Sequence, residues 1–262
     1  MKQYVVDAFT DQVFAGNQAA VCVLDCWLDD DLMQKIAVEN NFSETAFAVK
    51  EEADYRLRWF TPGGEIDLCG HATLATGYVI LRFYEPDAPS VTFRTLSGPL
   101  IVARRGTEYE MDFPAYALHP VPVTDAMEQA LGVRPQAAYL DRDLLLVLEE
   151  PETVANLAPD QDRLLALDGL LQIVSAPGGD YDCVSRVFAP KLAVPEDPVT
   201  GSAHCMLAPY WTRRLGKEIL SCYQASQRTG TLTCAMAGDR VKLAGQAALF
   251  AVSDLLPDQK DN

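Results

Sequence analysis

Residues 40–47, which read NNFSETAF, place one carboxylate between two hydroxyls directly before an apolar run. Glu44 stands between Ser43 and Thr45, at the start of a strand-like pattern that is bound for the core. A buried carboxylate needs a partner or a purpose, because removing an isolated charge from water is costly. A helix-capping box is excluded by spacing, since Ala46 stands where such a box requires Glu or Gln. Glu44 is therefore either a polar residue satisfied by nearby amides and hydroxyls or a general acid or base.

Two glycines precede apolar patterns at helical spacing and are surrounded by polar residues. Gly70 is followed by His71, and Gly201 is followed by Ser202. Glycine lets the backbone approach a ligand, and the amides and dipole at a helix N-terminus attract an anion. The junctions predict a site for a small carboxylate, although close helix packing would also explain both glycines. Asp197 precedes Pro198, so its backbone is biased toward extended geometry, and its side chain could cap the helix or face a cleft.

The cysteines test thiol chemistry. Racemases without cofactors use two thiols on opposite faces of one carbon. Counting 131 residues forward from Cys69, the offset between the two glycines, leads to Thr200 rather than to a second thiol. Two-thiol racemisation is therefore disfavoured, and the simplest role for Cys69 is that of a small buried residue. His204 lies one turn into the helix predicted after Gly201, and we expect it to have a structural role.

Composition narrows the classes of function further. The 262 residues carry a formal charge of −16, which argues against binding to nucleic acid or to an anionic membrane. No signal-peptide pattern or long apolar run is present, so we expect a cytoplasmic protein. Seven cysteines without a C-x-x-C pair, and three histidines, favour reduced thiols over a disulfide framework or a zinc site. The sequence thus predicts no metal and no cofactor.

The elements that must position these residues follow a mixed α/β order. Strand-like runs cover residues 4–9, 19–24, 45–50 and 55–60, and helices are predicted over 29–41 and 71–84. The glycine pairs Gly70 and Gly201, Gly98 and Gly230, and Gly106 and Gly238 recur at offsets of 131 or 132 residues. We interpret the chain as two similar halves, each with a glycine opening its main buried helix. The proline-broken segment 119–123 gives lobes of 1–117 and 118–262, with the C-terminal tail free to pack back on the first.

Four motifs, taken together and in this order, make nearly the whole chain similar to a known family. They are VDAFTDQVFAGNQAAV, NNFSETAF, LRWFTPGGEIDLCGHATLA and EDPVTGSAH, and they resemble the PhzF-like phenazine-biosynthesis family. That resemblance implies an α/β (α+β) fold shared with diaminopimelate epimerase, in which each of two lobes is a mixed sheet curled around a central helix. It also implies an active site in the cleft between the lobes, a homodimer, and an isomerase that moves a proton within a small unsaturated carboxylic acid without metal or organic cofactor.

The resemblance implies roles for single residues. Glu44 in S-E-T is the expected general acid/base, with His71 in G-H-A-T and Asp197 in E-D-P as the other catalytic residues. The expected substrate-binding residues are Ser43, Gly70, Gly201 and Ser202. Thr200 stands where the epimerases have a thiol, which puts epimerase activity in doubt.

An apolar setting raises the pKa of a carboxyl group toward neutrality, and Phe42 and Phe47 are the sequence neighbours expected to provide it for Glu44. Two alternatives stay open at this point. The chain could be a small-acid binding or regulatory module without turnover, or a lyase with Cys69 as its only base.

Overall fold

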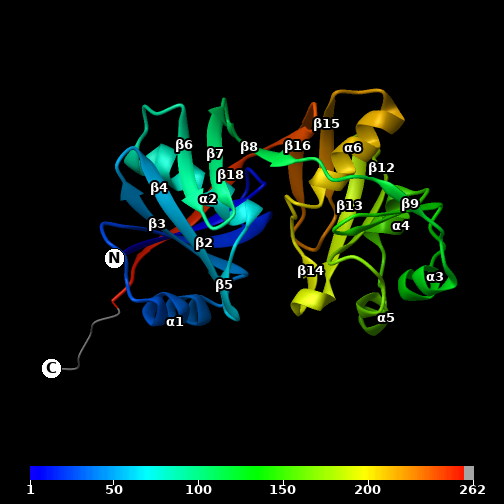
Figure 1. The fold of residues 1–262 in the computed structure, drawn as a ribbon, viewed down its shortest axis with the longest axis horizontal. Coiled ribbons are helices and arrows are strands. Elements are labelled where there is room, and N and C mark those ends of the chain that lie inside the picture. Colours follow the sequence, from blue (N-terminus) through cyan, green and yellow to red (C-terminus); the bar gives the residue numbers. More distant parts are fainter. Residues whose placement is uncertain (257–262) are drawn as a thin grey trace. The chain divides into compact units, whose positions relative to one another are not determined.

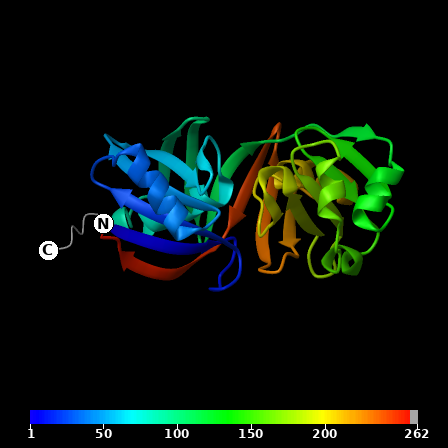
Figure 2. The same cartoon turned by 90° about the horizontal axis from the view of Figure 1, so that it is seen from below.

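The structure, a computed structural model, describes residues 1–256. The chain forms two compact units. Unit 1 comprises residues 1–111 together with the segment from Gly245 onward, and unit 2 comprises residues 112–244. The sequence-based lobes, 1–117 and 118–262, differ from these units by a few residues at the boundary and by the placement of the last strand. That strand, β18 (Ala247–Asp254), pairs antiparallel with β1 (Lys2–Ala8), as Figure 2 shows for the red and dark blue arrows.

Unit 1 is one mixed sheet whose strands lie in the order β18-β1-β2-β3-β4-β6-β7-β8, with the short β5 paired to β4. The pairs β2–β3 and β4–β6 are parallel and the other neighbours are antiparallel. The remaining elements of unit 1 are β2 (Asn17–Leu24), α1 (Asp30–Asn40), β3 (Glu44–Glu51), β4 (Asp54–Thr61), β5 (Gly64–Ile66), α2 (Gly70–Val79), a π-helical turn η1 (Ile80–Tyr84), β6 (Ser90–Thr95), β7 (Gly98–Arg105) and β8 (Glu108–Pro114).

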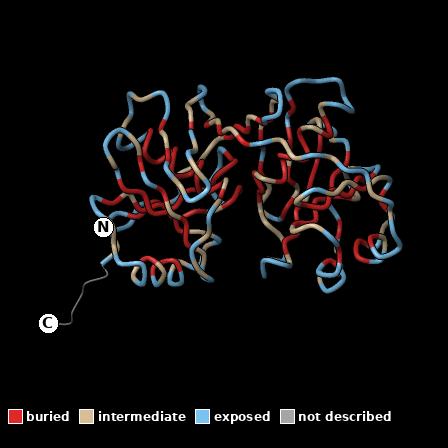
Figure 3. The backbone as a smooth tube through the Cα atoms, viewed as in Figure 1, coloured by how far each residue is buried: buried red, intermediate tan, exposed pale blue. Residues whose placement is uncertain are grey.

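The central element of unit 1 is α2. Every residue from His71 to Val79 is buried, and the helix packs against strands from several parts of the sheet. A helix that is apolar all round needs cover on all sides, which a curled sheet provides (Figures 1 and 3). By contrast, α1 buries one face, formed by Met33, Ile36 and Ala37, against the outside of β3 and β4. Both helices fall where the apolar spacing predicts them.

Unit 2 repeats this architecture. Its strands lie in the order β9-β10-β11-β12-β13-β15-β16-β17, with the short β14 paired to β13. The pairs β11–β12 and β13–β15 are parallel, at the positions that β2–β3 and β4–β6 occupy in unit 1. The elements are β9 (His119–Val121), α3 (Asp125–Leu131), β10 (Ala137–Leu140), β11 (Leu144–Val147), α4 (Pro151–Ala155), α5 (Gln161–Leu165), β12 (Gln172–Pro177), β13 (Cys183–Ala189), η2 (Pro190–Leu192), β14 (Val194–Asp197), α6 (His204–Leu215), β15 (Ile219–Gln224), β16 (Gly230–Ala237) and β17 (Arg240–Gly245).

The glycine matches mark equivalent points of the two units. Gly98 and Gly230 begin β7 and β16, and Gly106 and Gly238 lie in the turns that follow, at φ +62° and +68°. Left-handed backbone at both turns explains why glycine recurs there. The duplication read from the sequence is thus repeated in strand order, strand direction and turn geometry.

The helix predicted to follow Gly201 begins later than expected. His204 is its first residue, preceded by a tight turn in which the His204 and Cys205 amides donate to the Gly201 and Ser202 carbonyls. The expectation that a glycine opens each main helix is therefore right for Gly70 in α2 but wrong for Gly201, which opens the turn before α6. Within residues 1–256, none of the helices is both long and apolar enough to cross a membrane.

Candidate active site

The carboxylate of Glu44 pairs with the imidazole of His71. Glu44 is the first residue of β3, and His71 is the second residue of the central helix α2. Glu44 Oε2 lies 2.9 Å from His71 Nε2, with 15% of the Glu44 side chain and 7% of the His71 side chain exposed. Glu44 therefore pairs with a titratable partner rather than with the neighbouring hydroxyls, and part of its side chain stays exposed.

The adjacent hydroxyls serve other purposes. Thr45 is buried, and its Oγ1 accepts a hydrogen bond of 3.0 Å from Asn40 Nδ2. The same amide nitrogen donates to Gln3 Oε1 at 2.8 Å. Ser43 is exposed, in the loop that leads into β3. Asn40, the last residue of α1, thus ties the end of that helix to β1 and β3 and fixes the strand that carries Glu44.

The second ring nitrogen of His71 faces two polar groups. Asn17 Nδ2 lies 3.2 Å from His71 Nδ1, and Cys69 Sγ lies 3.6 Å from the same atom. When the ring is neutral, an amide that donates to Nδ1 leaves the proton on Nε2, the nitrogen that lies 2.9 Å from Glu44 Oε2. Sequence reasoning did not select Asn17, although it lies within the first of the four quoted motifs.

The groups of this cluster change the pKa values of His71 and Cys69. Burial alone would lower the pKa of His71, but the charge of the Glu44 carboxylate and the hydrogen bonds to Cys69 and Glu44 raise it well above the ordinary value. Burial and the Glu44 carboxylate raise the pKa of Cys69. Cys69 therefore remains a thiol near neutral pH, a poor form for a base, and the carboxylate–imidazolium pair is favoured.

Phe47 is not the apolar neighbour of Glu44. The aromatic ring belongs to the cluster under α1, with Met33 and Phe60, on the outer face of the sheet. Side chains alternate faces along a strand, so positions 44 and 47 of β3 point to opposite sides. The expectation that Phe47 desolvates the carboxylate is wrong; α2 and Cys69 provide the cover instead.

Unit 2 holds its predicted residues in one hydrogen-bonded loop between β14 and α6. Thr200 Oγ1 donates to Asp197 Oδ2 at 2.6 Å. Gln224 accepts from the Thr200 amide at 2.9 Å and donates to the Asp197 carbonyl at 2.7 Å. Gly201 and Ser202 follow at once in the tight turn. Gln224 lies at the end of β15, far along the sequence, and no local pattern points to its role.

Two groups of side chains in the described chain offer metal-ligand atoms within 4.8 Å of one another. The first is Glu44, Cys69 and His71, the cluster described above. The second, in unit 2, is His204, Cys222 and Cys234, all fully buried. Oxygen, nitrogen and sulfur donors of the first group suit proton transfer as well as metal binding, whereas the second group is of the kind that binds thiophilic ions.

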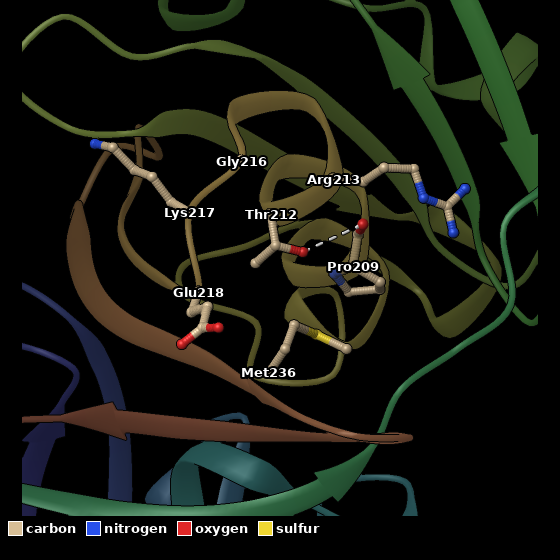
Figure 4. A pocket seen from close by; sticks show the side chains of 7 residues that line it. All are labelled: Pro209, Thr212, Arg213, Gly216, Lys217, Glu218 and Met236. Atoms are coloured by element: carbon tan, nitrogen blue, oxygen red, sulfur yellow. Dashed lines mark hydrogen bonds between the residues drawn. The ribbon is translucent and has the colours of Figure 1, made fainter.

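A surface hollow of about 360 Å³ lies at the end of α6, and none of these groups lines it. Its lining is Pro209, Thr212, Arg213, Gly216, Lys217, Glu218 and Met236 (Figure 4). The hydrogen bond inside it runs from Thr212 Oγ1 to the Pro209 carbonyl, within the helix. None of the residues selected from the sequence lines this hollow, and we assign it no part in the chemistry.

Two repeated α/β units, each a mixed sheet around a central helix, and an acid–base pair at the start of one of these helices define a protein of the diaminopimelate epimerase-like fold. The chain belongs to the phenazine biosynthesis-like protein family (PhzC-PhzF), whose pattern it matches over residues 6–252. The family and the fold implied by the four motifs are confirmed.

Individual relatives cover almost the whole chain. An uncharacterized isomerase of Pseudomonas aeruginosa is 50% identical over 247 residues, which are 94% of this chain and 95% of that protein. The crystal structure of a PhzF-family protein from Enterococcus faecalis superposes with a TM-score of 0.96 at 50% identity, covering 97% of this chain and 98% of that one. A probable proline racemase from Agrobacterium radiobacter shares the fold alone, with a TM-score of 0.67, 10% identity, and coverage of 99% and 94%.

Proposed function

We propose that the protein is an isomerase that moves a proton within a small unsaturated carboxylic acid, with Glu44 as general acid and base. The carboxylate removes a proton from one carbon, the double bond shifts, and the same carboxyl group returns the proton to another carbon on the same face. The proton removed from the first carbon is returned to the second, and the substrate is neither oxidised nor reduced. The proposed step therefore uses no redox or organic cofactor.

The observation that carries the proposal is the 2.9 Å pair of Glu44 and His71, in which 15% of the Glu44 side chain is exposed. A group that exchanges protons with a substrate must be reachable, and its partner must hold it in position. His71 meets the second need because it is buried and its other nitrogen contacts Asn17 and Cys69. An imidazolium at this distance would also steady the negative charge that forms when the proton leaves carbon.

Binding of the substrate carboxylate is proposed for the segment around Gly70, which opens α2, and for the turn of Gly201 and Ser202. The amides around Gly70 lie at the N-terminus of α2, next to His71, where the helix dipole favours an anion. The turn of Gly201 and Ser202 offers a backbone amide and a hydroxyl before α6. Asp197, tied to Thr200, would orient that turn or the substrate. Ser43 is proposed as a further contact because it is exposed beside Glu44.

The alternatives make different predictions. A lyase that relies on Cys69 needs a thiolate, whereas burial and Glu44 raise the pKa of this thiol. A binding module without turnover has no use for an accessible carboxylate paired with a histidine, but it would still bind small acids. Isotope exchange separates all three, because only the proposed isomerase requires Glu44 to move a proton.

A screen of a metabolite pool in D₂O tests the proposal. Wild-type protein is incubated with a bacterial extract enriched in small carboxylic acids, and mass spectrometry identifies any compound that gains deuterium. We expect at least one such compound with wild type and none with Glu44→Gln. Glu85→Gln is the matched control, since Glu85 is a partly exposed glutamate of unit 1 paired with Lys50 and Tyr55. Equal incorporation by wild type and Glu44→Gln would overturn the proposal, and exchange that survives alkylation of Cys69 would exclude the lyase.

The homodimer implied by the family resemblance is retained as part of this proposal. Light scattering during size-exclusion chromatography measures it directly, with a mass near twice 28.7 kDa expected.

A further inference from the structure

Two thiols of unit 2 lie side by side in its sheet. Cys222 and Cys234 are diagonal neighbours on β15 and β16, because their partners in the antiparallel pair are Leu232 and Leu220. Their sulfurs are 3.7 Å apart. Both residues are fully buried, so strand register gathers the two thiols at one interior point.

His204 adds a nitrogen to this group from the first residue of α6. Its Nδ1 lies 2.8 Å from the Thr200 carbonyl, which can only accept, so Nδ1 carries the proton. Nε2 is then a free lone pair on a fully buried ring, without a hydrogen-bond partner in the described part of the chain. The ligand atoms of His204, Cys222 and Cys234 lie within 4.8 Å of one another.

The arrangement has the features of a metal site rather than those of ordinary packing. Two zinc–sulfur bonds of about 2.3 Å at a tetrahedral angle hold their sulfurs about 3.8 Å apart, close to the separation found here. Histidines that bind a metal usually donate their other N–H to a carbonyl or carboxylate, as His204 does to Thr200.

We propose that His204, Cys222 and Cys234 bind one thiophilic divalent ion of the zinc class. The ion would link β15 and β16 of unit 2 to the start of α6. It would also hold the turn of Thr200, Gly201 and Ser202 through the hydrogen bond from His204. Its role is structural, because all its ligands are buried and none is assigned to the proposed proton transfer. Spacing in the sequence does not reveal this group, since its ligands come from three separated elements without a C-x-x-C pair.

Metal analysis of the purified protein, prepared without chelators or metal-affinity columns, tests the proposal. We expect about one zinc per chain, and apoprotein that binds one equivalent of added Zn²⁺ or Co²⁺. The Co²⁺ form is expected to show the intense near-ultraviolet absorption of thiolate-to-cobalt charge transfer. Removal of zinc is expected to lower the melting temperature, because an ion that binds only the folded chain stabilises it. Protein that contains no zinc and binds neither ion would overturn the proposal.

Variants assign the ligands. Cys222→Ser, Cys234→Ser and His204→Asn are each expected to weaken Zn²⁺ binding at least tenfold. Cys22→Ser is the matched control, since Cys22 is fully buried but lies in unit 1. Unchanged affinity in the Cys222 or Cys234 variant would contradict the assignment, and so would loss of zinc in the control.

X-ray absorption of the zinc-loaded wild type needs no variant to fold. We expect a first coordination shell dominated by sulfur with one nitrogen. A shell of oxygen and nitrogen alone would place the ion elsewhere, for example at Glu44 and His71, and would overturn the proposal.

Discussion

Glu44 Oε2 and His71 Nε2 approach to 2.9 Å at the point where the first residue of β3 meets the first turn of α2. Both ends of this contact are supported. Asn40 links β3 to β1 behind Glu44, and Asn17 lies against the far side of the His71 ring. A carboxylate–imidazole pair that is fixed on regular elements can keep its geometry while it exchanges protons.

The pair should make stability depend on pH. The folded-state pKa of His71 is raised above the ordinary value of 6.5, so the folded chain holds this proton more tightly than the unfolded chain does. The resulting stabilisation is fully present below pH 6.5 and is lost as the pH rises through the folded-state pKa. The difference in unfolding free energy between wild type and His71→Asn is therefore expected to shrink as the pH rises. Urea unfolding of both proteins across this range measures it.

The exposed His119 provides the control for that series. His119→Asn is expected to follow wild type at every pH. A difference between wild type and His71→Asn that stays constant or grows with rising pH would contradict the raised pKa.

Asn17 should tune the titration of His71. In Asn17→Asp a carboxylate replaces the amide that lies 3.2 Å from Nδ1, and an added negative charge favours the imidazolium. We expect the His71 pKa to rise further. With three histidines in the chain, NMR titration of the ring protons can follow each one, and the His71→Asn and His119→Asn variants assign the signals. A His71 pKa that is unchanged or lower in Asn17→Asp would show that the side chain at position 17 does not control the pKa of His71.

Gly77 is required for the packing of the central helix. A Cβ at this position would lie 2.5 Å from Cγ1 of Val102 on β7, and a β-branched side chain has little freedom to move away. Gly77→Ala should lower the free energy of unfolding by about 1–3 kcal/mol, despite the better helix propensity of alanine. Chemical denaturation measures the change. Gly63→Ala, whose new Cβ would meet its nearest neighbour at 3.5 Å, should change stability far less; equal effects would contradict the packing argument.

Local sequence patterns predict much of the fold. The apolar spacing predicts both α1 and α2, and the recurring glycines predict two similar units because the same left-handed turns follow β7 and β16. Motif resemblance also selected Glu44 and His71, which the structure brings together. Their contact itself could not be derived, since 27 residues separate them and only the packing of β3 on α2 closes the distance.

Other features depend on three-dimensional pairing. Strand alternation alone places Phe47 on the face of β3 opposite to Glu44. Asn17 and Gln224 become visible as partners only when distant strands are placed beside their helices. The thiol group of unit 2 arises from strand register, which spacing in the sequence does not reveal.

The central claim is that Glu44 carries the proton. Its most direct measurement is the rate of deuterium incorporation from D₂O, followed by NMR, into the first carbon acid identified as a substrate, with wild type and Glu44→Gln compared at equal concentration. Loss of a general acid/base typically costs 10²- to 10⁴-fold, so we predict at least about a hundredfold slower exchange in Glu44→Gln and an unchanged rate in Glu85→Gln. Exchange by a folded Glu44→Gln protein within a few-fold of the wild-type rate would contradict the account.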